Sequence, residues 1–188
     1  MGRIVVTEFV SLDGVMEAPG GEDFKYKAWS FDFDRGEEGD RFKLNEALES
    51  EALLLGRVTY EGFAAAWPSR EGPFADKLNR DPKYVVSTTL TEPEWQNTKL
   101  ISGRVSEAIT KLKHETDGVI LVAGSGTLVR TLLEADLVDE LRLMLFPTIL
   151  GRGRRLFPDG IDRLKLKLAE SRTVGSDGVQ IQIYTRAE

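Results

Sequence analysis

Blocks of apolar residues recur along the chain between polar and turn-forming residues, and their periods predict alternating strands and helices. Residues 3–10 form an apolar, β-rich run, which is followed by a loop rich in Gly, Pro and Asp. Residues 37–50 carry a rough apolar stripe of helical spacing, and 52–56 are wholly apolar, as in a strand covered on both faces. Residues 57–67 then predict a helix that begins directly after a glycine.

The middle of the chain continues this alternation. Residues 83–89 and 98–102 predict two short strands, and 105–115 predict a helix with apolar residues at i, i+3, i+4 and i+7. Residues 118–124 are a further apolar strand. An amphipathic helix follows at once, with its apolar residues on one side: Leu128, Val129, Leu132, Leu133 and Leu137.

Strict alternation of apolar and polar residues replaces this pattern in the last quarter of the chain. Residues 140–146, 164–168 and 179–184 each place an apolar residue at every second position, which is typical of strands with one buried face. A Gly-Ser-Asp-Gly turn at 175–178 predicts a hairpin. We therefore expect one α/β domain over residues 1–188, with a mixed, mostly parallel sheet, helices on both faces and antiparallel strands at the C-terminus.

Composition narrows the classes of function. The chain has 188 residues, of which 41% are hydrophobic and 30% charged, which suits one domain with a substantial core. The net charge of −6 is spread without a basic patch, so no nucleic-acid partner is expected. No apolar run approaches the roughly 20 residues that span a bilayer, and we expect a cytoplasmic protein without a membrane partner. Cysteine is absent and His114 is the single histidine, so neither a metal site nor a histidine-based triad is expected.

Two junctions between a strand and a helix carry glycine. Gly124, Ser125 and Gly126 separate a buried strand from the helix that follows, and Gly56 precedes Arg57 in the same way. The first amides of a helix lack intrahelical partners, and glycine lets a phosphate approach them closely. Such a junction is equally compatible with a tight turn that binds nothing, and the glycine spacing of the Rossmann fingerprint is not present.

A third segment supports the phosphate interpretation. Ser87, Thr88 and Thr89 follow another strand, and Thr59 lies in the first helical turn after Gly56. In an open α/β sheet, ligands bind beyond the carboxyl ends of the strands. These segments together predict a site for a phosphate-rich dinucleotide.

Five stretches in this order resemble the dihydrofolate reductase-like family: SLDG, LLLGRVTYEGF, VVSTTL, ILVAGSGTLVRTLLEADLVDEL and PTILGRGRRLF. The closer likeness is to the C-terminal reductase domain of the bifunctional riboflavin-biosynthesis protein, and it covers essentially the whole chain. The resemblance implies a central mixed sheet of about eight strands, which agrees with the eight strands expected above. It also implies NADPH as hydride donor and, often, a homodimer.

Cofactor-binding residues follow from the resemblance by position. One side of the NADPH pyrophosphate is implied to contact Gly56, Arg57, Val58 and Thr59, and the other side Gly124, Ser125, Gly126, Thr127 and Leu128. The 2′-phosphate is implied to meet Arg57, Ser87 and Thr88, with Arg104 as a weaker candidate. The loop 11–16, which includes Val15 and Met16, is implied to close over the nicotinamide.

The substrate side has several candidates. Counting back from Gly56, Asp40 falls on the position of the pterin-binding acid of dihydrofolate reductases, so the resemblance implies that it assists protonation. The longer segment before this helix leaves Asp32 and Asp34 as alternatives, and an acid near a helix N-terminus can also be a simple charge.

Aromatic and basic residues are further substrate-binding candidates. Trp67 either walls a substrate pocket or anchors a helix end in the core, and Phe31 belongs to an aromatic patch that either lines the pocket or packs on itself. Arg154, in an arginine-rich loop, either is solvated or reaches a phosphorylated substrate.

The sequence therefore predicts an NADPH-dependent reductase of a small heterocyclic or ribosylamino substrate. The closest reaction implied by the resemblance is reduction of 5-amino-6-(5-phosphoribosylamino)uracil, although the cysteine-containing zinc set of the usual partner deaminase is absent. Dihydrofolate reductase and a non-catalytic nucleotide-binding module are the alternatives. The apolar face of the C-terminal strands is compatible with a homodimer or with cover by the chain's own helices.

Overall fold

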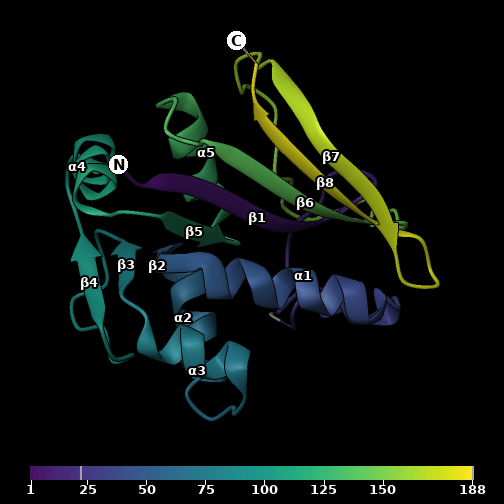
Figure 1. The fold of residues 1–188 in the computed structure, drawn as a ribbon, viewed down its shortest axis with the longest axis horizontal. Coiled ribbons are helices and arrows are strands. Elements are labelled where there is room, and N and C mark those ends of the chain that lie inside the picture. Colours follow the sequence, from purple (N-terminus) through teal and green to yellow (C-terminus); the bar gives the residue numbers. More distant parts are fainter. Residues whose placement is uncertain (22, 188) are drawn as a thin grey trace.

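An eight-stranded sheet forms the centre of the molecule and separates two layers of helices (Figure 1). The computed structural model describes residues 1–21 and 23–187. The strands are β1 (Arg3–Ser11), β2 (Ser50–Gly56), β3 (Lys83–Val86), β4 (Thr98–Ile101), β5 (Val119–Ala123), β6 (Glu140–Phe146), β7 (Leu166–Val174) and β8 (Val179–Arg186). The helices are η1 (Trp29–Asp32), α1 (Gly36–Glu49), α2 (Arg57–Ala66), α3 (Pro73–Arg80), α4 (Val105–Glu115) and α5 (Gly126–Glu134).

The strands lie in the order β4-β3-β2-β5-β1-β6-β8-β7. The first six strands in this order are parallel, and β8 is antiparallel to both β6 and β7. The prediction of a mostly parallel sheet of about eight strands with a C-terminal antiparallel hairpin is thus confirmed.

Strand β6 lies where the parallel and antiparallel parts of the sheet meet. It is parallel to β1 and antiparallel to β8, so the expected antiparallel pairing of the C-terminal strands is confirmed. Alternation arises here because the two faces of β6 have different neighbours. Leu141 and Leu143 belong to the large apolar core, whereas Arg142 lies on the opposite face among carboxylates.

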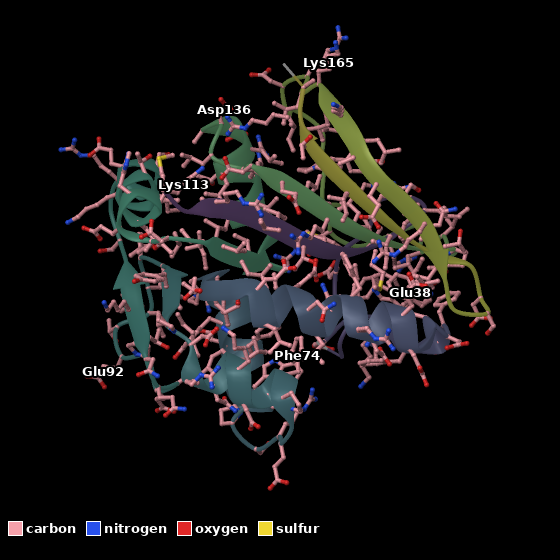
Figure 2. All side chains as sticks on the ribbon, in the orientation of Figure 1. Glu38, Phe74, Glu92, Lys113, Asp136 and Lys165 are labelled. Atoms are coloured by element: carbon pink, nitrogen blue, oxygen red, sulfur yellow. The ribbon has the colours of Figure 1, made fainter. Side chains whose placement is uncertain are left out.

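Helices cover both faces of the sheet. In Figure 1, α4 and α5 lie on one side, and α1, α2 and α3 lie on the other. The core under α4 and α5 includes Ile109 and Leu132, both fully buried. Figure 2 shows Lys113 on α4. Lys113 pairs with Asp139, which precedes β6, and so fastens this layer to the amino ends of the strands.

The sequence pattern did not predict all of the helices on the face of the sheet that α1, α2 and α3 cover. Helix α3 has only eight residues and begins at Pro73 after Gly72, so its apolar stripe is too short to stand out from a loop. The expected stripe of α1 is partly wrong, since Leu48 is half exposed and the buried face of this helix includes Glu46. Because the carboxylate of Glu46 is buried, polar partners are expected between α1 and the sheet.

No helix among residues 1–21 and 23–187 combines the length and the apolar content that crossing a membrane requires.

Candidate functional site

The predicted cofactor residues lie at one edge of the sheet. Strands β2, β3, β4 and β5 are parallel neighbours, so their carboxyl ends meet at this edge. Helix α2 begins directly after β2, and α5 begins three residues after β5. Because β2 and β5 are adjacent, the two glycine-containing junctions lie side by side.

The two junctions are joined directly by hydrogen bonds. The backbone amide of Gly56 donates to Oγ of Ser125 at 2.9 Å, and the amide of Ser125 donates to Oγ1 of Thr59 at 2.9 Å. Gly124 has a φ of +59°, and a Cβ built on it lies 3.0 Å from Oγ1 of Thr59. Glycine is therefore favoured at this position by both backbone conformation and space.

The amino ends of α2 and α5 differ from those of the other helices in charge. Neither has an acidic residue in its first turn, and neither has a side-chain cap. In contrast, the first turns of η1, α1, α3 and α4 all carry an acid. Because acids normally favour this position, the two junctions keep their positive helix ends available to an anionic ligand.

The loop after β1 packs against the same edge. Met16 is buried, and a Cβ at Gly126 would lie 2.7 Å from its sulfur, so the loop contacts the first residue of α5. Val15 is fully buried and forms an isolated bridge with Arg155. Asp13 accepts hydrogen bonds from the amides of Leu150 (3.1 Å) and Gly151 (2.8 Å). The loop is held in place by these contacts.

The candidates for the 2′-phosphate follow successive strands along this edge. Arg57 follows β2, and its guanidinium pairs with Glu61 at 2.9 Å on an exposed helix face. Oγ of Ser87, just after β3, accepts hydrogen bonds from the amides of Thr89 and Leu90, and Thr88 is exposed. Arg104 follows β4 and pairs with Glu107 in solvent. The fold brings all of these residues to one edge, in the order of their strands.

The three acidic candidates for proton assistance lie near the start of α1. Asp40 has a 66% exposed side chain, and its Oδ1 lies 2.6 Å from Nε of Arg35. Asp34 accepts hydrogen bonds from the side chain and the amide of Ser176, which hold the pKa of Asp34 below its usual value and tie this segment to the β7–β8 turn. Asp32 is exposed in η1. All three side chains are exposed.

The other substrate candidates are scattered. Phe31 is 66% exposed. Trp67 follows α2 and packs against Phe63 and Phe74, with ring centroids 6.1 and 5.0 Å away. Trp67 lies at the end of α2 that is farther from the strand edge, and its aromatic contacts agree with the interpretation that it anchors the helix end in the core. Arg154 pairs with Glu17 of the loop after β1, with 3.7 Å between the charged atoms.

A polar cluster between β1 and α1 was not predicted. Nζ of Lys43 donates to Thr7 (2.6 Å) and to Glu46 (2.5 Å), and Thr7 donates to Glu46 (2.9 Å). Arg142 of β6 approaches the same carboxylate to 3.9 Å. Lys43 and Arg35 also lie over the ring of Phe9, at 5.1 and 5.3 Å from its centroid. Positive charge thus gathers beside an aromatic face near the end of β1.

Glu8 is a further buried acid near this site that the sequence interpretation missed. It is 4% exposed, and its Oε1 has no hydrogen-bond partner among the described residues. Burial raises the pKa of Glu8 well above its usual value and Glu46 adds to this rise, whereas Lys43 and a hydrogen bond from the Gly124 backbone oppose it. The available signal was a single acid inside the apolar run 3–10.

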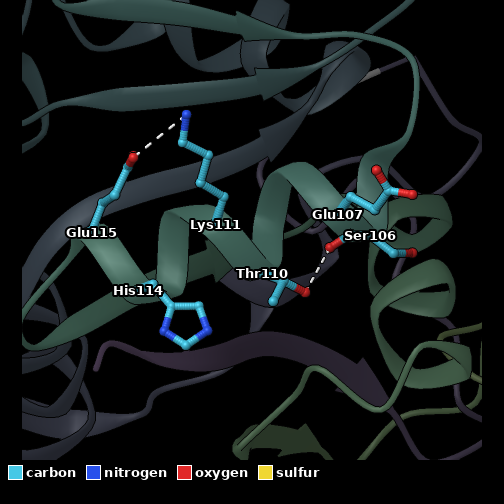
Figure 3. Close-up of a pocket in the computed structure, with 6 residues that line it drawn as sticks. All are labelled: Ser106, Glu107, Thr110, Lys111, His114 and Glu115. Carbon is cyan, nitrogen blue, oxygen red and sulfur yellow. Dashed lines mark hydrogen bonds and ion pairs between the residues drawn. The ribbon is translucent and has the colours of Figure 1, made fainter.

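Two other features of the described residues do not form a competing site. A hollow of about 550 Å³ lies along the surface of α4, but Figure 3 shows that its lining, which includes Thr110, Lys111 and His114, comes from one helix without converging polar groups. Over residues 1–21 and 23–187, no group of three or more His, Asp or Glu side chains is arranged to hold a metal ion.

Comparison with known proteins agrees with this architecture. Residues 3–180 match the family model described as the RibD C-terminal domain. The uncharacterized protein YyaP of Bacillus subtilis is 32% identical over 186 residues, covering 95% of this chain and 93% of that protein.

Two solved structures have the same fold. A Shewanella sp. PV-4 protein, described provisionally as a riboflavin biosynthesis protein, has a TM-score of 0.80 at 23% identity, with 99% of each chain covered. Dihydrofolate reductase from Enterococcus faecalis, solved with NADP(H) and RAB-propyl, has a TM-score of 0.60 at 16% identity over 99% of this chain and 97% of that chain.

Proposed function

Because the chain belongs to the RibD C-terminal domain family, we propose that it is an NADPH-dependent reductase of a small heterocyclic or ribosylamino substrate. The observation that carries this proposal is the pair of interlocked junctions at Gly56 and Gly124. They belong to the two helices whose first turns lack an acid, and they meet at adjacent strand ends. The E. faecalis reductase that shares the fold was solved with NADP(H), which adds support.

The residues at this edge fit a dinucleotide phosphate. The close approach of Thr59 to Gly124 disfavours a side chain there, and glycine keeps the backbone accessible. The first amides of α5, from Gly126 to Leu128, have no intrahelical acceptor and would hold the pyrophosphate together with the start of α2. Arg57, Ser87 and Thr88 would bind the 2′-phosphate. When bound, NADPH supplies the hydride for a C=N or C=O bond.

The substrate side supports a compound that is aromatic and anionic. Phe9 offers a ring, and Lys43 and Arg35 bring positive charge to it. The most specific candidate reaction is reduction of 5-amino-6-(5-phosphoribosylamino)uracil. Dihydrofolate reduction ranks second, because the acid expected for pterin binding, Asp40, is exposed and paired with Arg35.

We also propose a homodimer formed through β7. This edge strand leaves Leu166 (37%) and Leu168 (50%) exposed, with Leu164 just before it at 44%. An exposed apolar edge strand favours pairing with another chain. Light scattering after size exclusion tests this, and Leu168→Glu is expected to give a monomer if the edge is the interface.

Replacement of Gly56 by Asp tests the nucleotide site. A Cβ at Gly56 meets only ordinary contacts, with Ser125 at 3.6 Å, so the variant is expected to fold while a carboxylate repels phosphate. NADPH fluorescence titration should then show at least a hundredfold loss of affinity, whereas Gly62→Asp, on the exposed surface of α2, should bind normally. Equal affinities for the two variants would place the nucleotide elsewhere.

A further inference from the structure

Glu8 occupies the point at which the central strands separate. Strands β1 and β5 pair up to Thr7 and Ala123. The next residues are Glu8 on β1 and Gly124, where the chain turns with positive φ toward α5. Glu8 therefore lies beside the proposed nucleotide junction, and Lys43 and Glu46 of the polar cluster are close enough to act on its charge.

The surroundings of Glu8 are mostly apolar. Val6 and Val10, two residues away on β1, belong to the large apolar core, and so does Leu143, which is its register partner on β6. The charged side chains that act on Glu8 are Lys43 and Glu46 of α1. Lys43 pairs with Glu46 at 2.5 Å, and its attraction for Glu8 is outweighed by burial, so the pKa of Glu8 remains raised. A buried acid in such surroundings favours its neutral form.

The unpartnered oxygen of Glu8 indicates a functional role for this acid. A buried carboxyl oxygen without a hydrogen-bond partner costs free energy, and such groups concentrate at functional sites. The backbone of Gly124 lies close enough to lower the pKa of Glu8, so the carboxyl lies beside the start of the α5 junction. An ionised Glu8 would also disfavour a phosphate beside Gly124, so the neutral form suits the ligand-bound state.

We propose that Glu8 is a proton-donating residue of this site, which holds its proton while a reduced nicotinamide dinucleotide is bound and releases it when the nicotinamide ring becomes positively charged. This inference rests on the proposed function. The reductant is NADPH, whose hydride goes to the carbon of the substrate C=N or C=O bond. The proton of Glu8 goes to the nitrogen or oxygen of that bond. The resulting carboxylate then neutralises the positive ring, and Glu8 regains a proton from water once NADP⁺ leaves.

Calorimetric titration with NADP⁺ and NADPH tests this assignment without a substrate. Each titration is run at pH 7 in two buffers with different ionisation enthalpies, which gives the number of protons released on binding. The phosphates are common to both nucleotides, so the difference between the two reports the effect of the ring charge alone. We expect NADP⁺ to release about one proton more than NADPH. Glu8→Gln, which is neutral and of similar shape, should abolish the difference, and the exposed Glu115→Gln should preserve it.

The outcomes distinguish the two proposals. If neither nucleotide binds, the proposed function fails. If both bind and release equal numbers of protons from the unmodified protein, the proposed function stands and the role of Glu8 is overturned. Loss of the difference in Asp40→Asn rather than in Glu8→Gln would assign the proton to Asp40 and also overturn it. An infrared carbonyl band of a protonated carboxyl at pH 7, absent in Glu8→Gln, is the expected second signature.

Discussion

Two neighbouring regions of the strand edge are built in different ways. The nucleotide junctions consist mainly of backbone, with glycine at 56 and 124 and two hydroxyl groups that bridge the loops. The cluster beside β1 consists of side chains from three elements, Thr7 of β1, Lys43 and Glu46 of α1 and Arg142 of β6, and its charged groups are largely buried. Backbone sites are specified locally in the sequence, whereas a buried charge cluster exists only once the chain has folded.

The largest effect is expected from breaking the charge cluster. Lys43→Met leaves Glu46, which is 1% exposed, without its closest cation, and this should lower the free energy of unfolding by about 3 kcal/mol. Urea denaturation measures the change. Lys111→Met, which breaks an exposed pair on α4, serves as control and should cost less than about 0.5 kcal/mol. If both variants lost a similar amount of free energy of unfolding, the buried cluster would contribute no more to stability than an exposed ion pair.

A smaller effect is expected from loosening the junctions. Thr59→Val removes the acceptor of the Ser125 amide, which should cost about 1 kcal/mol of stability and weaken NADPH binding about tenfold. The matched control is Thr110→Val, because that hydroxyl bonds only to a carbonyl of its own helix. Unchanged NADPH affinity in Thr59→Val would mean that the link between the two loops does not shape the site.

The pH dependence of stability probes Glu8 in the absence of ligand. Burial raises the pKa of Glu8 in the folded chain. The stabilisation of the fold by protonated Glu8 is therefore fully present below the ordinary pKa of glutamate and is lost as the pH rises through the raised pKa of the folded state. The melting temperature of Glu8→Gln, taken relative to that of the unmodified protein at the same pH, should therefore rise by about 2 °C between pH 5 and pH 8. A constant difference across this range would contradict a protonated Glu8.

The smallest effect is expected at the rim of the nucleotide site. Arg57→Ala should weaken NADPH binding about fivefold and leave NADH binding unchanged, because an exposed arginine contributes modestly to phosphate recognition. Arg130→Ala breaks a pair of the same spacing and similar exposure on α5, and should change neither affinity. An equal loss for both nucleotides in Arg57→Ala would remove this residue from 2′-phosphate recognition.

The same contrast explains what the sequence could predict. Hydrophobic periodicity gave the strands and the order of the helices, because each buried face repeats with the period of its own element. Glycine at the strand ends indicated the junctions, since positive φ and close approach are local requirements. The short helix α3 and the parallel pairing of β6 with β1 depend on packing partners distant in sequence, and local pattern does not encode them.

Side-chain chemistry was harder to predict than backbone geometry. Ungapped counting selected Asp40, yet the rotation of α1 turns this residue to solvent and turns Glu46 toward the sheet. Glu8 was hidden within an apolar run, because alternation alone does not reveal that a polar residue lies at the point where two strands separate. Identification of such residues requires the register of neighbouring strands.

Calorimetric titration of the unmodified protein with NADPH and then with NADH tests the central claim most directly. The interlocked junctions and the basic and hydroxyl residues beside them predict micromolar or tighter binding of NADPH and much weaker binding of NADH. If neither nucleotide bound, the two junctions would be ordinary turns, and the family likeness would describe a fold without a reductase site.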